Sequence, residues 1–301
     1  MNNKRRLFST VLCVAALTAG LFVSGCGSDK AGGIVSVVSS VVDGGNEKAA
    51  AKLNTLIDAT NRFNSDNASF AQFQAEGLAK LKGGFAEGAI TNQPHFDRLQ
   101  ADLEKAKKEG STFKEVDAER DNVLNILNEL VPVYKDLTAY DDSKAYMNDG
   151  GAKGKELAAK YVTAVEKFDA AYAKFNETLN KVNAEQSKKQ IEKLKKDGKK
   201  GYAAAMESTL RLTELVDKLE KAPQNADKAA VEKELSEIEA LLKSINNDRG
   251  QVLADRYNSV VGDVRQVLAD PSDNNLNNMI EGFNGYIDTY NSTTPDQFDA
   301  K

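Results

Sequence analysis

Cysteine and histidine are scarce in this chain of 301 residues, and tryptophan is absent. The sequence holds two cysteines and one histidine. Catalytic arrangements of the Cys-His or Ser-His-Asp type therefore have little support, and a metal site with several histidine ligands is excluded. The one histidine, His95, lies in NQPHFDRL, where we expect an exposed or helix-capping position. We therefore expect a protein that is not an enzyme and has no cofactor.

Proline is also infrequent, and neither sign of charge dominates strongly. Five prolines in so long a chain favour helices over many short strands. Hydrophobic residues make up 41% and charged residues 28%, which is typical of a folded, soluble body. Removal of an N-terminal segment with three basic residues would change the formal charge from −5 to −8. An acidic body of this kind predicts no binding to nucleic acid.

The N-terminus has the pattern of a targeting segment. Lys4, Arg5 and Arg6 precede an uncharged apolar run, residues 7–23. The following Val23-Ser24-Gly25-Cys26 resembles the lipobox of bacterial lipoproteins, in which cleavage between Gly25 and Cys26 leaves a lipidated N-terminal cysteine. The alternatives are an ordinary secretory signal or an uncleaved membrane anchor. The other cysteine, Cys13, lies in the removed segment, so no disulfide is expected.

The lipobox resemblance also implies a location. Its sorting rule keeps lipoproteins with Asp after the lipidated cysteine in the inner membrane. The residue here is Gly27, so the resemblance implies an outer-membrane protein that faces the periplasm, with the membrane as a partner through its N-terminal lipid. We expect a signal peptide at 1–25, a flexible lipidated tether at 26–46, a helical-bundle domain at 47–295 and a C-terminal tail at 296–301. Residues 34–42 either lie on the membrane or pack on the body.

Helical periodicity dominates from residue 46 onward. Helices are predicted at 50–64 with a continuation before the breaker at 83–88, and then at 95–109, 114–140, 153–196, 202–221, 226–247, 250–269 and 273–291. Pro132 is expected to kink the 114–140 helix without ending it. The pattern predicts an all-α fold, an elongated antiparallel helical bundle with long coiled-coil-like helices, because the 153–196 helix alone would be about 66 Å long.

The clearest packing seam lies within the longest predicted helix. Its apolar positions are spaced by three and four residues, as in helices that pack against one another. These positions are Leu157, Tyr161, Val165, Phe168, Tyr172, Phe175, Leu179 and Val182.

One central segment carries a family resemblance. YDDSKAYMNDGGAKGKELAAKY, residues 140–161, is similar to a motif of the YiiG-like bacterial lipoproteins. The motif residues are Tyr140, Tyr146, Asp149, Lys153, Gly154 and Lys155. The resemblance implies a helical protein of unassigned biochemical function. The chain departs from the family pattern at Ala158, where relatives carry histidine.

Two segments partly match the sequence patterns of ligand-binding loops. DGGAKGKE lacks the first glycine and the final Ser or Thr of a phosphate-binding loop, so a glycine-containing entry to a helix is the simpler interpretation. Residues 270–281 place Asp270, Ser272, Asn274, Asn278 and Glu281 at the spacing of a calcium loop, which makes them a weak metal candidate. Asn275 replaces the glycine of such loops. A proline turn with Ser272 or Asp273 as N-cap is preferred, and we therefore expect no metal site.

A lysine-rich run, residues 187–200, could contact anionic lipid or an acidic envelope protein. The lysines nominated for this contact are Lys188, Lys189, Lys195, Lys196, Lys199 and Lys200. A solvated helix end is the alternative.

Three hypotheses about function follow. The preferred one is a non-catalytic lipoprotein whose bundle is a binding or structural module. The second is a carrier of a small or lipidic ligand, with a cavity lined by Phe168, Tyr172 and Phe175. The third is a carboxylate-dependent envelope glycan hydrolase, for which the sequence offers no favoured acid pair.

Overall fold

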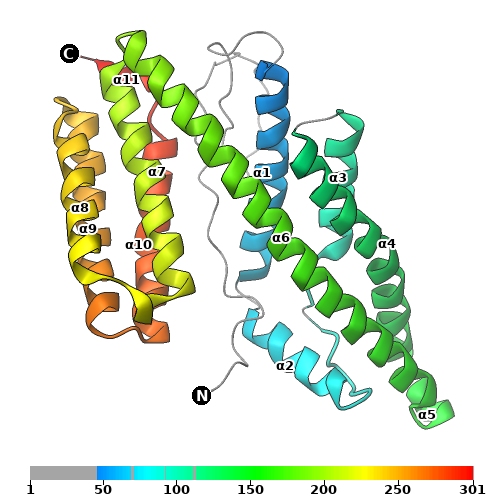
Figure 1. Ribbon diagram of the computed structural model, residues 1–301. Helices are drawn as coiled ribbons and strands as arrows, with labels where there is room; N and C mark the ends of the chain where they lie inside the picture. The colour runs from blue at the N-terminus through cyan, green and yellow to red at the C-terminus, as the bar shows by residue number, and fades with distance from the viewer. Residues whose placement is uncertain (1–45, 69–70, 92, 111–112, 301) are drawn as a thin grey trace. The chain divides into compact units, whose positions relative to one another are not determined.

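The computed structural model describes residues 46–68, 71–91, 93–110 and 113–300 (Figure 1). The residues of the targeting segment, Gly25, Cys26 and the 34–42 segment lie outside the described residues. Within the described part, regular structure is helical throughout. The all-α prediction is therefore confirmed. The helices fall into two compact units, 55–182 and 183–300, the second of which also takes in 46–54. A single helical-bundle domain over 47–295 had been expected from the sequence.

The first unit contains four complete helices and most of two others. They are α1 (Asn46–Ala68), α2 (Ala71–Lys82), α3 (Phe96–Lys108), α4 (Lys114–Asp142), α5 (Tyr146–Asp149) and α6 (Ala152–Lys196). The helix α4 continues through Pro132, as predicted. His95 occupies the N-cap position of α3, one of its two expected positions, and Pro94 lies just before it.

An aromatic cluster forms the centre of the first unit. Seven of the eight seam positions on α6 are buried, and Tyr172 is partly buried. The ring of Phe168 lies 5.9 Å from Phe63 on α1 and 5.0 Å from Phe96 on α3, both with edge-on geometry. Aromatic pairs at such distances add attraction to the burial of their surface. The spacing that predicted a packing seam therefore produces one.

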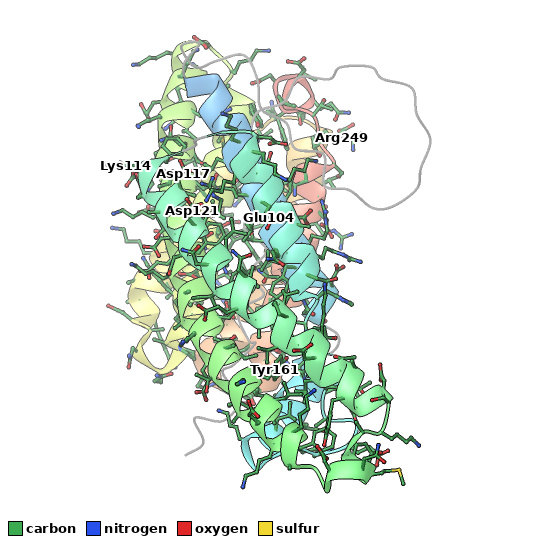
Figure 2. The ribbon with its side chains drawn as sticks, turned by 90° about the vertical axis from the view of Figure 1, so that its right-hand side faces the viewer. Glu104, Lys114, Asp117, Asp121, Tyr161 and Arg249 are labelled. Atoms are coloured by element: carbon green, nitrogen blue, oxygen red, sulfur yellow. The ribbon has the colours of Figure 1, made fainter. Side chains whose placement is uncertain are left out.

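A buried arginine lies on α4 close to this core. Arg120 is 4% exposed and forms ion pairs with Asp117 at 2.8 Å and Asp121 at 2.9 Å. Figure 2 labels both aspartates near the beginning of α4, beside Lys114. Since a buried guanidinium is costly without partners, the two carboxylates explain how a polar residue occupies an apolar position of this helix.

The second unit is built around α7 (Lys200–Lys221). After a short 3-10 turn, η1 (Pro223–Asn225), the chain returns as α8 (Lys228–Lys243), α9 (Asp248–Ala269), α10 (Asp273–Asn291) and α11 (Pro295–Asp299). The side chains of α7 pack on α8, α10 and α11, and α9 packs between α8 and α10. One continuous apolar core joins these helices. Asp227, Asn247 and Ser272 cap the N-termini of α8, α9 and α10 with their side-chain oxygens.

The C-terminal residues were expected to form a tail, and the structure contradicts this expectation. Phe298 on α11 is 2% exposed, and its ring stacks with those of Tyr202 and Tyr290 at centroid distances of 6.1 and 6.0 Å. The side chain of Asn247 donates hydrogen bonds to backbone carbonyls of α11. One buried ring and these bonds dock the segment on the second unit.

Candidate functional site

The residues of the family motif come together where α4, α5 and α6 meet. Asp149 accepts a hydrogen bond from the Tyr140 hydroxyl at 2.6 Å and from the backbone N–H groups of Gly151 and Lys153 at 2.9 and 3.1 Å. These bonds, that of Tyr140 first, hold the pKa of Asp149 below its usual value. Asp149 therefore satisfies the N–H groups at the start of α6, where the phosphate of a nucleotide loop would otherwise bind.

Gly154 is required by close packing at the same corner. A Cβ atom at this position would lie 2.5 Å from the Tyr140 ring and 2.6 Å from the Phe85 ring. Phe85 also contacts Tyr146, with ring centroids 5.3 Å apart, and a hydrogen bond with Glu87 raises the pKa of Tyr146 to about 12. The two tyrosines, the aspartate and the glycine of the motif thus join three helices to the loop at 83–91. Their arrangement is that of a structural joint.

The two lysines of the motif lie on the surface of this corner. Lys153 and Lys155 are exposed, as is Met147 on α5 at 75%. The backbone N–H of Lys153 donates to Asp149 in the joint, but within the described residues neither lysine side chain is seen to contact it. Ala158, which follows the motif on α6, is fully buried. The outer surface of this corner is therefore a mixture of cationic and apolar groups.

The lysine-rich run is partly neutralised by carboxylates of its own unit. Lys188 pairs with Glu214 at 3.0 Å, Lys195 with Glu192 and Glu207, and Lys199 with Asp296 at 3.0 Å. Within the described part of the chain, no ion pair is seen for Lys189, Lys196 or Lys200, and all three are exposed. Three of the six nominated lysines therefore remain as cationic groups for a partner.

The aromatic residues nominated for a ligand cavity are engaged with one another. Phe168 and Tyr172 stack with centroids 5.1 Å apart, Tyr172 lies 6.4 Å from Phe175, and both phenylalanines are at most 1% exposed. The Tyr172 hydroxyl donates to the side-chain oxygen of Asn64 at 3.0 Å. The three rings pack as a helix–helix seam.

The calcium-like segment has the geometry of a helix start. Ser272 caps α10, and the Asn275 side chain donates to the backbone oxygen of Asp270 at 2.8 Å. Asn274, Asn278 and Glu281 all lie on the helix, which begins at the fourth of the twelve positions. A calcium loop curls around its ion before its second helix begins, whereas α10 already begins at Asp273, so the N-cap interpretation is confirmed. Across the described residues, no group of three or more His, Cys, Asp or Glu side chains could hold a metal ion.

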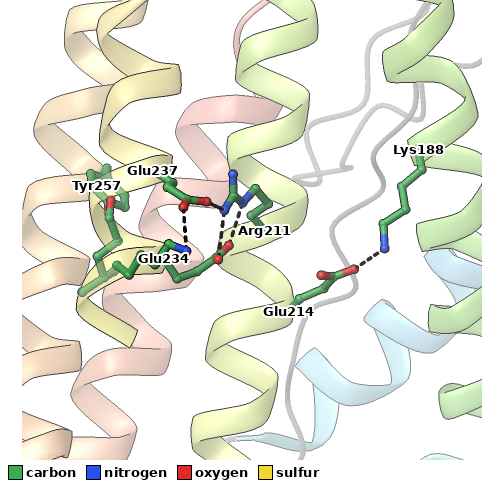
Figure 3. A network of polar contacts seen from close by, with 8 residues as sticks. Lys188, Arg211, Glu214, Glu234, Glu237 and Tyr257 are labelled. Atoms are coloured by element: carbon green, nitrogen blue, oxygen red, sulfur yellow. Dashed lines mark hydrogen bonds and ion pairs between the residues drawn. The ribbon is translucent and has the colours of Figure 1, made fainter. Parts of the chain in front are cut away.

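A charged cluster that the sequence analysis missed lies between α7 and α8. Figure 3 shows Arg211 reaching across to Glu234 and Glu237, and Lys188 reaching Glu214. The guanidinium donates to both carboxylate oxygens of Glu234 at 2.6 and 2.9 Å and also pairs with Glu237. Hydrogen bonds to Glu234 and Glu237 raise the pKa of Arg211. They outweigh burial, which lowers it. The only sequence signal was that Arg211 and Glu234 are almost equally far from the turn at Pro223.

Beside this cluster, α7, η1 and α8 enclose a cavity of about 580 Å³. Its volume is within the range of small-molecule sites. The lining combines apolar side chains with a charged rim and includes no residue that the sequence analysis nominated. Sequence could not have revealed the cavity, because it results from short side chains at a turn whose geometry the periodic pattern does not specify.

None of the helices in the described residues is long and apolar enough to span a membrane. Of the comparisons with known proteins, the one with family models finds a match. No curated protein and no solved structure matches the chain. A family model described as "Protein of unknown function (DUF3829)" matches residues 47–252, which is more than half of the chain. The chain belongs to the DUF3829 family.

Proposed function

We propose that this protein is a lipid-anchored lipoprotein of the bacterial outer membrane that faces the periplasm, with a non-catalytic helical module that binds or supports an envelope partner. The observation that carries the proposal is the sequence Val23-Ser24-Gly25-Cys26 after a basic start and an uncharged apolar run. Three acyl chains at Cys26 would make attachment effectively permanent, since one chain gives only reversible binding. The motif at 140–161 supports placement among the YiiG-like members.

The described side chains favour a module without catalysis. His95 is exposed at the N-cap of α3, and its side chain makes no capping hydrogen bond. The motif residues are engaged in packing and helix capping, and Lys189, Lys196 and Lys200 leave a cationic face on which an acidic protein or anionic lipid could dock. No nucleic-acid partner is proposed, because the body is acidic.

A carrier function is the second candidate, and a different observation from the one expected favours it. The aromatic seam of α6 is filled, but the cavity between α7 and α8 is open to a small ligand. Binding there would be compatible with a lipid anchor, since a tethered carrier can still load and release a ligand.

Intact-mass analysis of the membrane-extracted protein tests the anchor. We expect a chain that starts at Cys26 with three acyl groups, and we expect Cys26→Ala to abolish both cleavage and acylation. Cys13→Ala is the matched control, because this cysteine lies in the removed segment and its loss leaves the mature mass unchanged. A native chain that keeps its first 25 residues, or is cleaved without acylation, would refute the lipoprotein proposal.

Membrane fractionation tests the location. Gly27→Asp introduces the residue that the sorting rule associates with inner-membrane retention. We expect the native protein in the outer-membrane fraction and this variant in the inner-membrane fraction, both with the same acylated N-terminus. Equal distribution of the two proteins would remove the support for an outer-membrane location and leave the anchor intact.

A further inference from the structure

The cavity between α7 and α8 lies wholly within the second unit. Its lining comes from the C-terminal half of α7, the turn η1 and the first two turns of α8. The apolar lining residues are Leu215, Leu219, Ala222, Ala226, Ala230 and Val231. Leu219 and Val231 belong to the buried core of the unit, and Ala226 packs against that core. The floor of the cavity is therefore the outer surface of the buried apolar core.

Short side chains keep this space open. Three alanines line the cavity, at positions where a larger residue would project into it. Ala230 is exposed on α8 and lines the cavity, whereas its neighbour Ala229 is also exposed but does not line it. The pair offers a direct comparison between a residue that limits the cavity and one that does not.

Most charges on the rim already have partners. Arg211 is held by Glu234 and Glu237, and Lys221 pairs with Asp217 at 2.8 Å. Glu214 pairs with Lys188 at 3.0 Å (Figure 3).

The two remaining rim charges differ in their surroundings. The Asp227 carboxylate accepts hydrogen bonds from two N–H groups at the start of α8. Lys218 is exposed on the rim, and within the described residues it makes no ion pair or hydrogen bond. Its charge acts only at longer range, where it is one of the cations that lower the pKa of Glu234. Lys218 is thus the rim group with the greatest capacity to bind an added anion.

We propose that this cavity binds a small amphiphile with an acidic head group, whose hydrocarbon chain lies on the floor formed by Leu219, Ala226 and Val231 and whose head group contacts Lys218. An apolar floor with one available cation at its rim matches the two parts of such a molecule. A medium-chain carboxylate is the simplest member of this class. The inference extends the proposed binding module by naming its ligand class, and it does not depend on lipidation at Cys26.

Photolabelling of the complete chain tests the site and its chemistry. The probe is decanoate with a diazirine at the end of its chain, activated by light and followed by peptide mass mapping. We expect adducts within residues 215–231 that decanoate competes away. Decanol has the same chain length without the charge, and we expect it to compete about tenfold more weakly, the equivalent of one charge-assisted contact.

Two pairs of variants separate binding from general damage. Ala230→Leu should reduce specific labelling about tenfold because it fills the cavity, whereas Ala229→Leu should leave labelling unchanged. Lys218→Gln should weaken competition by decanoate but not by decanol, whereas Lys228→Gln, which is outside the lining, should alter neither. Thermal unfolding by circular dichroism confirms that each variant is folded, and Ala226→Leu replaces Ala230→Leu if the latter is not.

The following results would overturn the proposed ligand or its site. Adducts spread over the chain, or labelling that decanoate does not reduce, would overturn the site. Equal effects of Ala229→Leu and Ala230→Leu would do the same, because only one of these residues lines the cavity. Equal loss of decanoate and decanol competition in Lys218→Gln would overturn the acidic head group. None of these outcomes bears on the mass of the N-terminus, so the lipid anchor stands or fails separately.

Discussion

Removal of the Phe298 ring should destabilise the second unit far more than its position near the C-terminus suggests. The side chain is 2% exposed and stacks with Tyr202 and Tyr290. Around it, the N–H of Gly201 donates to the Asp299 carboxylate at 2.7 Å, and Asn247 donates to the carbonyl of Phe298 itself at 3.0 Å. Phe298→Ala therefore removes the apolar anchor of a segment that also makes several polar contacts.

Two effects set the expected loss in the free energy of unfolding. The missing ring leaves a cavity, and α11 can detach from the core. Phe→Ala substitutions in protein cores cost about 3–5 kcal/mol. A terminal helix can also detach, which caps the loss at the free energy that docks α11, so we expect about 3 kcal/mol. The assay is urea unfolding followed by circular dichroism and by tyrosine fluorescence, which is usable because the chain has no tryptophan. If the two units unfold separately, only the transition of the second unit should move.

A matched control uses an exposed phenylalanine. Phe73 on α2 is 59% exposed, so Phe73→Ala should change the free energy of unfolding by less than about 0.5 kcal/mol. If Phe298→Ala costs no more than Phe73→Ala, the last residues behave as the tail that the sequence predicted, and the reasoning from burial fails. Gly201→Ala is an independent check, because its Cβ would lie closer than 3.0 Å to the Phe298 carbonyl and would displace α11.

Two further changes test the first unit. Gly154→Ala should lower the free energy of unfolding in urea by about 2 kcal/mol, because its Cβ would lie 2.5 Å from the Tyr140 ring. The control Gly262→Ala, in open space on α9, should be neutral or stabilising. Equal effects of the two variants would refute the packing argument. Burial raises the pKa of Asp169 from 3.8 to about 7, so the folded chain binds a proton that the unfolded chain releases, and stability falls as the pH rises from about 4 through 7. Asp169→Asn should therefore raise the unfolding free energy by about 2 kcal/mol more at pH 8 than at pH 5 and by almost nothing near pH 3, and an equal gain at all three pH values would contradict this assignment.

The helices were predictable because the same residues specify local and tertiary structure. Along α6, the spacing from Leu157 to Val182 sets both the helical face and the packing seam. Gly110 and Pro223 mark the ends of helices because the backbone restrictions of glycine and proline act locally. Pro132 did not end α4, since packing on both sides maintains the helix across one missing hydrogen bond.

The candidate site was less predictable because its residues meet only through tertiary structure. The motif from Tyr140 to Gly154 was visible as a pattern, but nothing in the pattern indicated that Phe85 would pack against both its ends. The start of α10 could be predicted, because Pro271 and a capping serine at 272 act locally. The α7–α8 cavity depends on which side chains are too short to fill a turn, and sequence spacing carries no such information.

The family match covers only part of the second unit. The match ends at residue 252, within the first turns of α9. Yet the core that contains Leu219 and Val231 also contains Tyr257, Phe283 and Phe298, all buried beyond that limit. A chain cut at 252 would expose the apolar face of α7 that α10 and α11 cover, so the second unit needs these two helices to be stable. The cavity lies entirely within the matched residues, whereas the helices that hold its floor in place lie partly outside them.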